Sequence, residues 1–364
     1  AGSNDEIITI GLQELSQLMR NPAQEFFRQS LHVNFSSPDE EQSVDEPFAM
    51  SNLEKWQVNQ SILEQSIYHY SGDNAPATEI LSEMIQQIQG SGILPLPPFD
   101  TDIKQEISQT ISSTIEQIST LLASHPQRQS RLVSVWSESV NIQLEDSIAD
   151  IWTAPNTGTA IRLVNAGSSI WAGKKGKQGK PKWHYLARHW PYHLACQLDG
   201  PVTTWLVSAD SSSALLPLDA DTAMQALQTL LHCYACNLKS PLVAEPGTSC
   251  ALIDTPEKDD TTEISTIEAR LAYEGSGSAE RGFPAVQQSY ALERLWPDFD
   301  SLLSARSLTE QDSGHLSGSD NIYIDQTLLF QHSLSLYRLM CEHWHYSRST
   351  LNETGTSRGS DAAS

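Results

Sequence analysis

The strongest constraint on the fold lies between residues 131 and 208, where short apolar segments alternate with turn residues. Short segments rich in β-branched and aromatic residues, bounded by Gly, Pro or Asn, are typical of β-strands, whereas apolar residues three to four apart indicate a helix. The order of these patterns predicts strand, strand, strand, helix and strand. The expected strands cover residues 132–136, 142–152, 161–164 and 203–207, and the expected helix covers 185–197. This order predicts an α/β fold with a mixed sheet flanked by helices.

The same order resembles the core of the PD-(D/E)xK nuclease fold. Sites of that fold place one carboxylate late in the second strand, and a second carboxylate and a lysine two residues apart on the third. The carboxylates bind Mg²⁺ through hard oxygen ligands, and the metal activates water and stabilises the charge that develops on the phosphate. Here the second strand offers Asp150, but the third offers only Leu163-Val164-Asn165, which holds neither an acid nor a lysine.

The missing acids extend well beyond that strand. No Asp or Glu occurs from residue 151 to 198, although 45 of the 364 residues are acidic. Without a second acid, a metal ion would lack most of its charge-neutralising ligands, so the sequence predicts a nuclease-like core without a catalytic site. A register shift of one residue would put Ala149 in the metal position and turn Asp150 to the other face. We therefore expect Asp150 to be an exposed strand acid, and a residual metal ligand is the alternative.

Charge is distributed unevenly along the chain. The formal net charge is −23, whereas a free-standing DNA-binding protein is usually basic because its affinity comes largely from phosphate neutralisation. Five of the nine lysines nevertheless fall within nine residues, at Lys174, Lys175, Lys177, Lys180 and Lys182. Trp171 and Trp183 flank this lysine segment and could stack on bases. The segment is the best DNA-contact candidate, and the alternative is a solvated loop between two core tryptophans.

Other patterns argue against metal, cofactor and membrane. The single Cys233-x-x-Cys236 pair lacks the further ligands of a zinc site, and His184, His189 and His193 have no acid nearby, so we expect neither set to bind metal. The chain contains no GxxxxGK[ST] motif, and hence no P-loop ATPase. Five scattered cysteines suggest a reducing compartment, and no apolar run approaches the roughly 20 residues of a membrane span, so a cytoplasmic location is expected.

The flanking regions read as mainly helical. Residues 8–33 are expected to be helical with a break, where Asn21 caps a second helix that has Pro22 at its first position. A long amphipathic helix is expected over residues 103–122, and short strands or extended pieces at 241–243 and 251–253. We expect a helical cover subdomain at 7–126, the nuclease-like core with a helical C-terminal cap at 127–345, and a disordered tail at 346–364.

Several short motifs, in order, resemble the C-terminal domain of RecC, the gamma subunit of exodeoxyribonuclease V (RecBCD). Each motif is weak alone, but their order and spacing extend over nearly all of residues 7 to 340. They are LMRNPAQEFFRQSLHVNF at residues 18–35, Gly92-Ile93-Leu94-Pro95, the run from Tyr234 to Pro246, Ala272-Tyr273-Glu274-Gly275 and Arg294-Leu295-Trp296.

The resemblance implies a nuclease-like domain without activity in a heterotrimer that repairs double-strand breaks by recombination. Its partners would be RecB-like and RecD-like subunits, which carry the motors and the working nuclease, and its ligands double-stranded DNA ends and forked DNA. Working nucleases of this class often carry Gln-x-x-x-Tyr on the helix after the third strand, where this chain has Arg188 and Tyr192. Together with Asp150 and Asn165, these are the expected vestigial nuclease positions.

Two other functions stay open at this point. One is a working Mg²⁺-dependent nuclease that combines Asp150 with acids from elsewhere in the fold, such as Glu138 or Glu145. The other is a subunit-docking scaffold that makes no contact with DNA.

Overall fold

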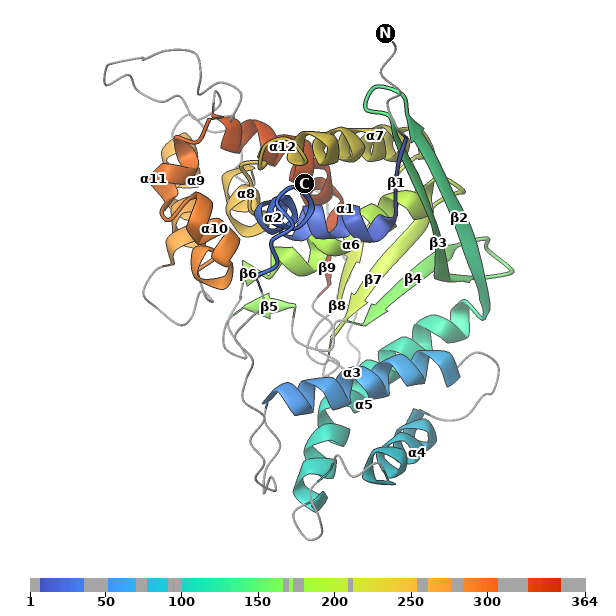
Figure 1. Ribbon diagram of the computed structural model, residues 1–364. Helices are drawn as coiled ribbons and strands as arrows, with labels where there is room; N and C mark the ends of the chain where they lie inside the picture. Colours follow the sequence, from blue (N-terminus) through green and yellow to red (C-terminus); the bar gives the residue numbers. More distant parts are fainter. Residues whose placement is uncertain are drawn as a thin grey trace, which may run out of the picture.

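The computed structural model describes residues 7–35, 52–69, 77–90, 94, 100–165, 170–172, 180–208, 212–253, 261–275, 284–306 and 327–347. These residues build a mixed sheet with helices on both faces, as the α/β prediction expected (Figure 1). Among the described helices, none is both long enough and apolar enough to cross a membrane.

The sheet has seven strands, and β1, β3, β4, β7, β8 and β9 follow one another across it while β2 pairs with β3 at the edge. The β1–β3 and β4–β7 pairs are parallel, and the other pairs are antiparallel. A separate two-stranded hairpin joins β5 and β6. The strands are β1 (Ile8–Ile10), β2 (Gln127–Ser137), β3 (Ile142–Thr153), β4 (Ala160–Asn165), β5 (Trp171–Ala172), β6 (Lys180–Pro181), β7 (Val202–Val207), β8 (Ser212–Leu215) and β9 (Trp344–Ser347).

The predicted strands and helix are found in the expected order as β2, β3, β4, α6 (Trp183–Gln197) and β7, but the short hairpin of β5 and β6, which was not expected, lies between β4 and α6. The turn between β3 and β4 includes Gly158, whose φ of +68° favours glycine. One expectation for the N-terminal region is wrong. Residues 8–10 form a strand rather than the start of a helix, because they pair with residues 142–144 of β3, far away in sequence.

A β-bulge in β3 decides which side chains face which layer. Gln129 pairs with Ile151 but Arg131 pairs with Ile148, so β3 carries one extra residue at positions 149–150. Such an insertion shifts the alternation of side chains by one position. Ile148 and Ile151 consequently belong to the same core cluster although they are three residues apart, and Trp152 belongs to the core on the other face.

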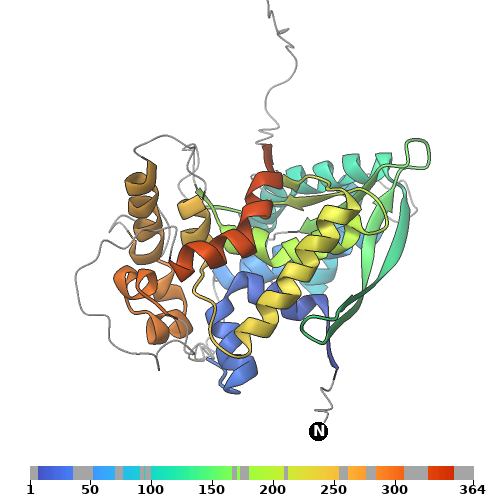
Figure 2. The ribbon, with the colours of Figure 1, turned by 90° about the horizontal axis from the view of Figure 1, so that it is seen from above.

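Four helices cover one face of the sheet: α1 (Leu12–Arg20), α6, α7 (Ala220–Asn237) and α12 (Leu328–His343). Their apolar side chains form the main core with β1 to β4, β7 and β8. Trp190 and Leu194 of α6 lie at the centre of this core and are fully buried. Figure 2 shows α7 and α12 on this face, where they pack against each other.

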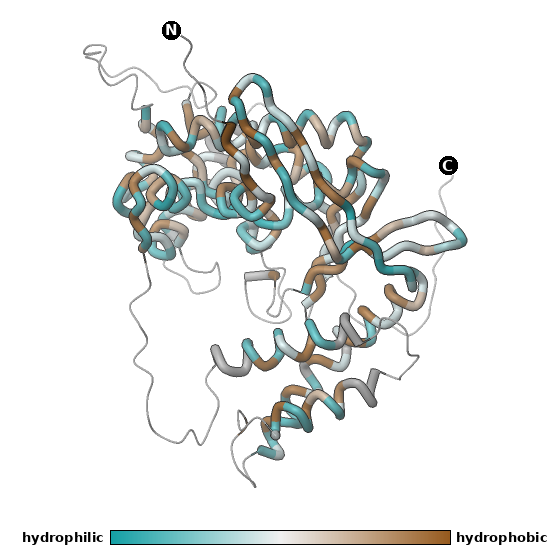
Figure 3. Tube along the Cα trace, turned by 45° about the vertical axis from the view of Figure 1, so that its right-hand side comes forward, coloured by the Kyte–Doolittle hydropathy of each residue, from teal (hydrophilic) through white to brown (hydrophobic). Residues whose placement is uncertain are grey.

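The other face is covered by α3 (Asn52–His69), α4 (Ala77–Gly90) and α5 (Asp100–Ser124), which lie below the sheet in Figure 1. The isoleucines of α5 recur every three to four residues, at 103, 107, 111, 115 and 118, and all are buried. They pack with Trp152, Ile161 and Leu163 of the sheet. In Figure 3 the tubes of these helices alternate between hydrophobic and hydrophilic colours, as expected for amphipathic helices.

A third, smaller core joins α2 (Pro22–Ser30) to a cap made of α8 (Pro246–Ile253), α9 (Thr261–Glu274), α10 (Tyr290–Leu295), α11 (Phe299–Leu303) and the start of α12. The Asn21 side chain accepts a hydrogen bond from the Gln24 amide at 3.0 Å, with Pro22 at the first helical position, which confirms the predicted cap. The extended segment expected at 251–253 is wrong, because these residues end α8. A short apolar run has no periodicity that separates a strand from a buried helix.

A buried polar network fixes α6 against the sheet. The His193 Nδ1 lies 2.9 Å from the Thr204 hydroxyl, and its Nε2 lies 3.0 Å from the Leu216 carbonyl oxygen. A carbonyl oxygen only accepts, so Nε2 carries the proton of the neutral ring and Nδ1 accepts from Thr204. Burial lowers the pKa of His193 to about 3.

His193 should therefore make the fold sensitive to acid. Its pKa in the folded state lies below the ordinary 6.5, so only the unfolded chain takes up this proton as the pH falls from about 6.5 toward 3. At pH 5 this difference should remove about 2 kcal/mol of stability relative to pH 7. Denaturant unfolding at both pH values, with His193→Gln beside the unaltered chain, measures the effect. The variant should be less stable at pH 7 but lose less stability on acidification, and an equal loss in both proteins would contradict the account.

Candidate nucleic-acid interface

The candidate site lies where α6 crosses β4. α6 lies in the connection between the parallel strands β4 and β7, so this helix packs back against one face of the sheet. β4 reads AIRLVN, and Arg162 is its only charged residue. Arg162 pairs with Ile151 on one side and Thr204 on the other, and Ile151 belongs to the core on the α6 face. The alternation of side chains therefore directs Arg162 toward α6.

Among the described residues, no carboxylate forms an ion pair with the guanidinium of Arg162, although the charge of Asp150 acts on it. The guanidinium lies over the ring of Tyr192, 5.0 Å from the ring centre, in a cation–π arrangement. Its Nε and Nη1 atoms are shielded from solvent and have no hydrogen-bond acceptor, although the residue as a whole is only partly buried. Burial is the main cause that lowers the pKa of Arg162, but an arginine still carries its charge at neutral pH. The sheet thus presents to α6 a positive charge that no described ion pair compensates.

Cations and tyrosines alternate along the neighbouring face of α6. Tyr185, Arg188 and Tyr192 are three and four residues apart, which places them on one side of the helix. The Tyr185 ring contacts Lys182 before it and Arg188 after it, each 5.7 Å from the ring centre. We refer to Lys182, Tyr185, Arg188, Tyr192 and Arg162 together as the cation–tyrosine row. It begins at the C-terminal end of the lysine segment and ends at β4.

Burial and the positive charges of the row lower the pKa values of two nearby histidines, His184 and His189. Burial, followed by the charges of Arg20, Lys182 and Arg188, lowers the pKa of His184 to about 4. Burial, together with the charges of Arg162 and Arg188, holds the pKa of His189 well below its ordinary value. His189 Nε2 accepts a hydrogen bond of 3.0 Å from the Arg188 Nε, so its ring is neutral. At pH 7 the positive charge of this region therefore comes from arginine and lysine.

Asp146 on β3, which the sequence patterns did not single out, has a structural role here. The Asp146 carboxylate accepts a hydrogen bond of 2.8 Å from the amide of Leu12, at the start of α1. Gly11 precedes that helix and offers no side chain for capping. The Asp146 carboxylate on β3 therefore accepts a hydrogen bond that an N-cap side chain would otherwise accept. The Glu14 carboxylate accepts a hydrogen bond of 3.0 Å from the amide of Gly11. Asp146 and Glu14 are thus both used to fix the start of α1.

The structure does not bring the four expected vestigial positions together. Asp150 forms an ion pair of 2.5 Å with Arg128, whose guanidinium lies over Trp152 on the α5 side of the sheet. Arg188 and Tyr192 lie on α6, on the opposite side. Asn165 is buried at the end of β4. The bulge at positions 149–150 accounts for the separation, because it changes the face to which Asp150 points.

The lysine segment is only partly described. Lys174, Lys175 and Lys177 lie outside the described residues, and only the backbone of Trp171 and Lys180 is described, in β5 and β6. Lys182 is half-buried beside Tyr185. Trp183 packs edge-on against Trp344, with ring centres 5.0 Å apart. That contact makes Trp183 part of the packing around α6.

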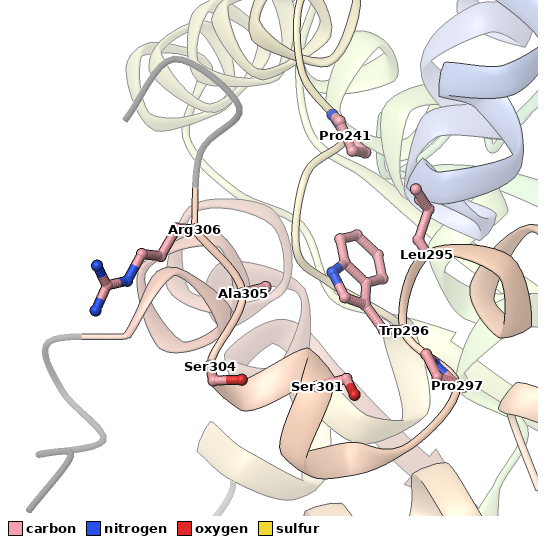
Figure 4. Close-up of a pocket in the computed structure, with 8 residues that line it drawn as sticks. All are labelled: Pro241, Leu295, Trp296, Pro297, Ser301, Ser304, Ala305 and Arg306. Atoms are coloured by element: carbon pink, nitrogen blue, oxygen red, sulfur yellow. The ribbon is translucent and has the colours of Figure 1, made fainter. Parts of the chain in front are cut away.

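Two further features bear on possible chemistry, namely groups of metal-binding side chains and a pocket. Within the described parts of the chain, no three His, Cys, Asp or Glu side chains are grouped so that they could hold a metal ion. Figure 4 shows a pocket between α10 and α11 whose lining includes Trp296 and Pro241. Arg306 also lines this pocket, and its side chain points away from the indole of Trp296. The residues lining this pocket include neither a carboxylate nor a histidine. It therefore lacks the groups for acid–base chemistry.

Comparison with known proteins gives two findings. The family model of the RecC C-terminal domain matches residues 8–256. The RecBCD enzyme subunit RecC of Escherichia coli (strain K12) is 22% identical over 282 residues, which cover 74% of this chain and 22% of that protein. The chain therefore spans about a fifth of the length of this curated relative.

Proposed function

This chain belongs to the RecC C-terminal domain family, and we propose that it is a non-catalytic nuclease-like module of a RecBCD-type complex. In this role it guides or splits duplex DNA and docks RecB-like and RecD-like subunits during double-strand-break repair by homologous recombination. The complex works in the cytoplasm. Nuclease and ATPase chemistry belongs to the partner subunits.

The observation that carries the proposal is the cation on β4. In a PD-(D/E)xK nuclease, the third strand supplies a carboxylate and a lysine, and the helix after it often supplies a glutamine and a tyrosine. Here the strand supplies Arg162, and the helix supplies Arg188 and Tyr192. Fixed guanidinium groups repel a divalent cation and attract phosphate. A core of this kind holds nucleic acid without cutting it.

The charge pattern supports the same function. An acidic protein of net charge −23 repels DNA over most of its surface. The span of residues 151–198 has no acid and contains both the lysine segment and the cation–tyrosine row. The most favourable approach for DNA is therefore along the segment and the helix that follow β4 in the sequence.

The working nuclease is the weaker alternative. Asp150 is paired with Arg128, and Glu138 and Glu145 are exposed; among the described residues, these acids do not form a group suited to a metal ion. Two arginines at the nuclease-like position also oppose metal binding.

A cleavage assay tests the proposal. The chain is incubated with end-labelled forked duplex DNA and Mg²⁺ or Mn²⁺, and binding and strand length are followed on native and denaturing gels. We expect a shifted complex with intact strands. Cleavage that is lost in an Asp150→Asn variant would contradict the proposal in favour of a working nuclease. Intact strands without any complex would favour the docking scaffold, and pull-downs with the motor subunits would then follow.

A further inference from the structure

We infer that Arg162 and Arg188 form a phosphodiester-binding site for single-stranded nucleic acid, in which arginines take the place that a metal ion has in a nuclease. The inference rests on the proposed function and specifies which residues of the core hold the strand. It differs from the lysine segment in both place and chemistry. The lysine segment is known from the sequence, whereas the two arginines lie on β4 and α6.

The first argument concerns hydrogen bonding. Arginine has five N–H donors, and buried donors in native proteins nearly always find acceptors. Arg162 places Nε and Nη1 where neither water nor a described acceptor reaches them. Its side chain lies over the ring of Tyr192 and interacts electrostatically with Cys196 and Asp150, and the described residues supply no hydrogen bond to Nε or Nη1. Because these two donors are closed to solvent, a ligand oxygen reaches them only when the side chain turns outward along the partly exposed side of the residue, and the bound ligand then supplies the acceptors that the fold lacks.

The second argument concerns charge. Arg188 uses its Nε on His189, and none of its described contacts is with a carboxylate. Burial and the charges of Arg20 and Arg162 lower the pKa of Arg188, so two like charges are held near each other. An anion between them would relieve this repulsion. Phosphate suits the site because guanidinium groups can bind it through two parallel hydrogen bonds.

The third argument decides the class of ligand. An acidic peptide would also supply oxygen atoms, but it would gain nothing from the exposed parts of the aromatic rings. Tyr185 and Tyr192 alternate with the cations, and interleaved aromatic rings and cations are typical of surfaces that bind single strands. The row also continues directly from the lysine segment. These features favour the backbone and bases of a strand over a partner's acidic segment.

Binding of a labelled oligodeoxythymidine, measured by fluorescence anisotropy with a chelator present, tests the inference. Arg162→Met and Arg188→Gln should each weaken binding about tenfold or more, which is the usual effect of losing hydrogen bonds to a charged group. Each should also reduce the slope of log affinity against log salt by about 1, which corresponds to one lost phosphate contact. The control is Arg338→Met, which changes an exposed arginine of α12 that pairs with Glu342 at 2.9 Å. It should bind like the unaltered chain, and thermal melting confirms that every variant is folded.

The outcomes separate this inference from the proposed function. Unchanged binding by the folded Arg162→Met variant, together with weak binding after charge reversal in the lysine segment, would overturn the phosphodiester site and leave the proposed function standing. No binding of oligonucleotide or forked DNA by the unaltered chain would overturn both. A third outcome is that Arg162→Met weakens the binding of polyglutamate but leaves the binding of the oligonucleotide unchanged. This result would assign the site to an acidic partner and overturn the inference.

Discussion

Replacement of Arg162 by methionine should stabilise the fold, by about 1–3 kcal/mol. Among the described residues, two shielded nitrogens of the guanidinium have no acceptor and no carboxylate forms an ion pair with it, so the folded state carries a desolvation penalty that the unfolded chain does not. Methionine keeps an unbranched stem of similar reach and removes the charge. Loss of the contact with Tyr192 opposes the gain by roughly 0.5–2 kcal/mol, which sets the lower end of the expected range.

Chemical denaturation at pH 7 measures this change, with Arg338→Met as the matched control. The control removes an exposed arginine with one ion pair, so its effect should stay within about 0.5 kcal/mol. A substitution that stabilises a fold but weakens ligand binding is typical of a residue kept for function. A clear loss of stability in Arg162→Met would mean that Arg162 is a structural residue, and the phosphodiester site would lose its main support.

Charge reversal of Lys174, Lys175, Lys177 and Lys180 to glutamate should weaken binding to forked DNA by roughly a hundredfold or more. Each lysine that contacts a phosphate releases a counterion, so the slope of log affinity against log salt should fall by up to about 3 to 4 if all four take part. Lys182 is left unchanged because it contacts the ring of Tyr185. Fluorescence anisotropy with a labelled fork at several salt concentrations gives both quantities.

The control for this experiment reverses four exposed cations elsewhere, which changes the net charge by the same amount. These are Lys239, Arg294, Arg306 and Arg338. If DNA responds only to overall charge, both fourfold variants should weaken binding equally, and the lysine segment has no special role. A much larger loss in the lysine-segment variant would assign the contact to that segment.

Local patterns were enough to predict the centre of the fold. β2, β3, β4, α6 and β7 each carry a periodicity that burial imposes on a strand or a helix, so their types and order could be derived. The cap at Asn21 and Pro22 is equally local, because both residues act within one turn of helix. β1 could not be derived in this way. Three residues give too short a pattern, and their partner strand lies more than a hundred residues away.

The candidate site depended on features that no local pattern reveals. The extra residue at positions 149–150 of β3 changes the face of Asp150, while Asp146 lies on the α1 side and caps that helix. The sequence does contain one signal for Arg162, because an arginine inside the apolar strand AIRLVN is unusual for a strand covered on both faces. Its lack of a partner depends on the packing of α6 and can be seen only in the structure.

The most direct test of the account is equilibrium binding of forked duplex DNA by the unaltered chain across a salt series, first in chelator and then with Mg²⁺. A core that holds DNA without cutting it should bind at low salt, lose affinity steeply and linearly on a logarithmic scale as salt rises, and leave both strands intact with the metal. No binding at the lowest salt, or binding that does not depend on salt, would contradict the account and favour a module that only docks partner subunits.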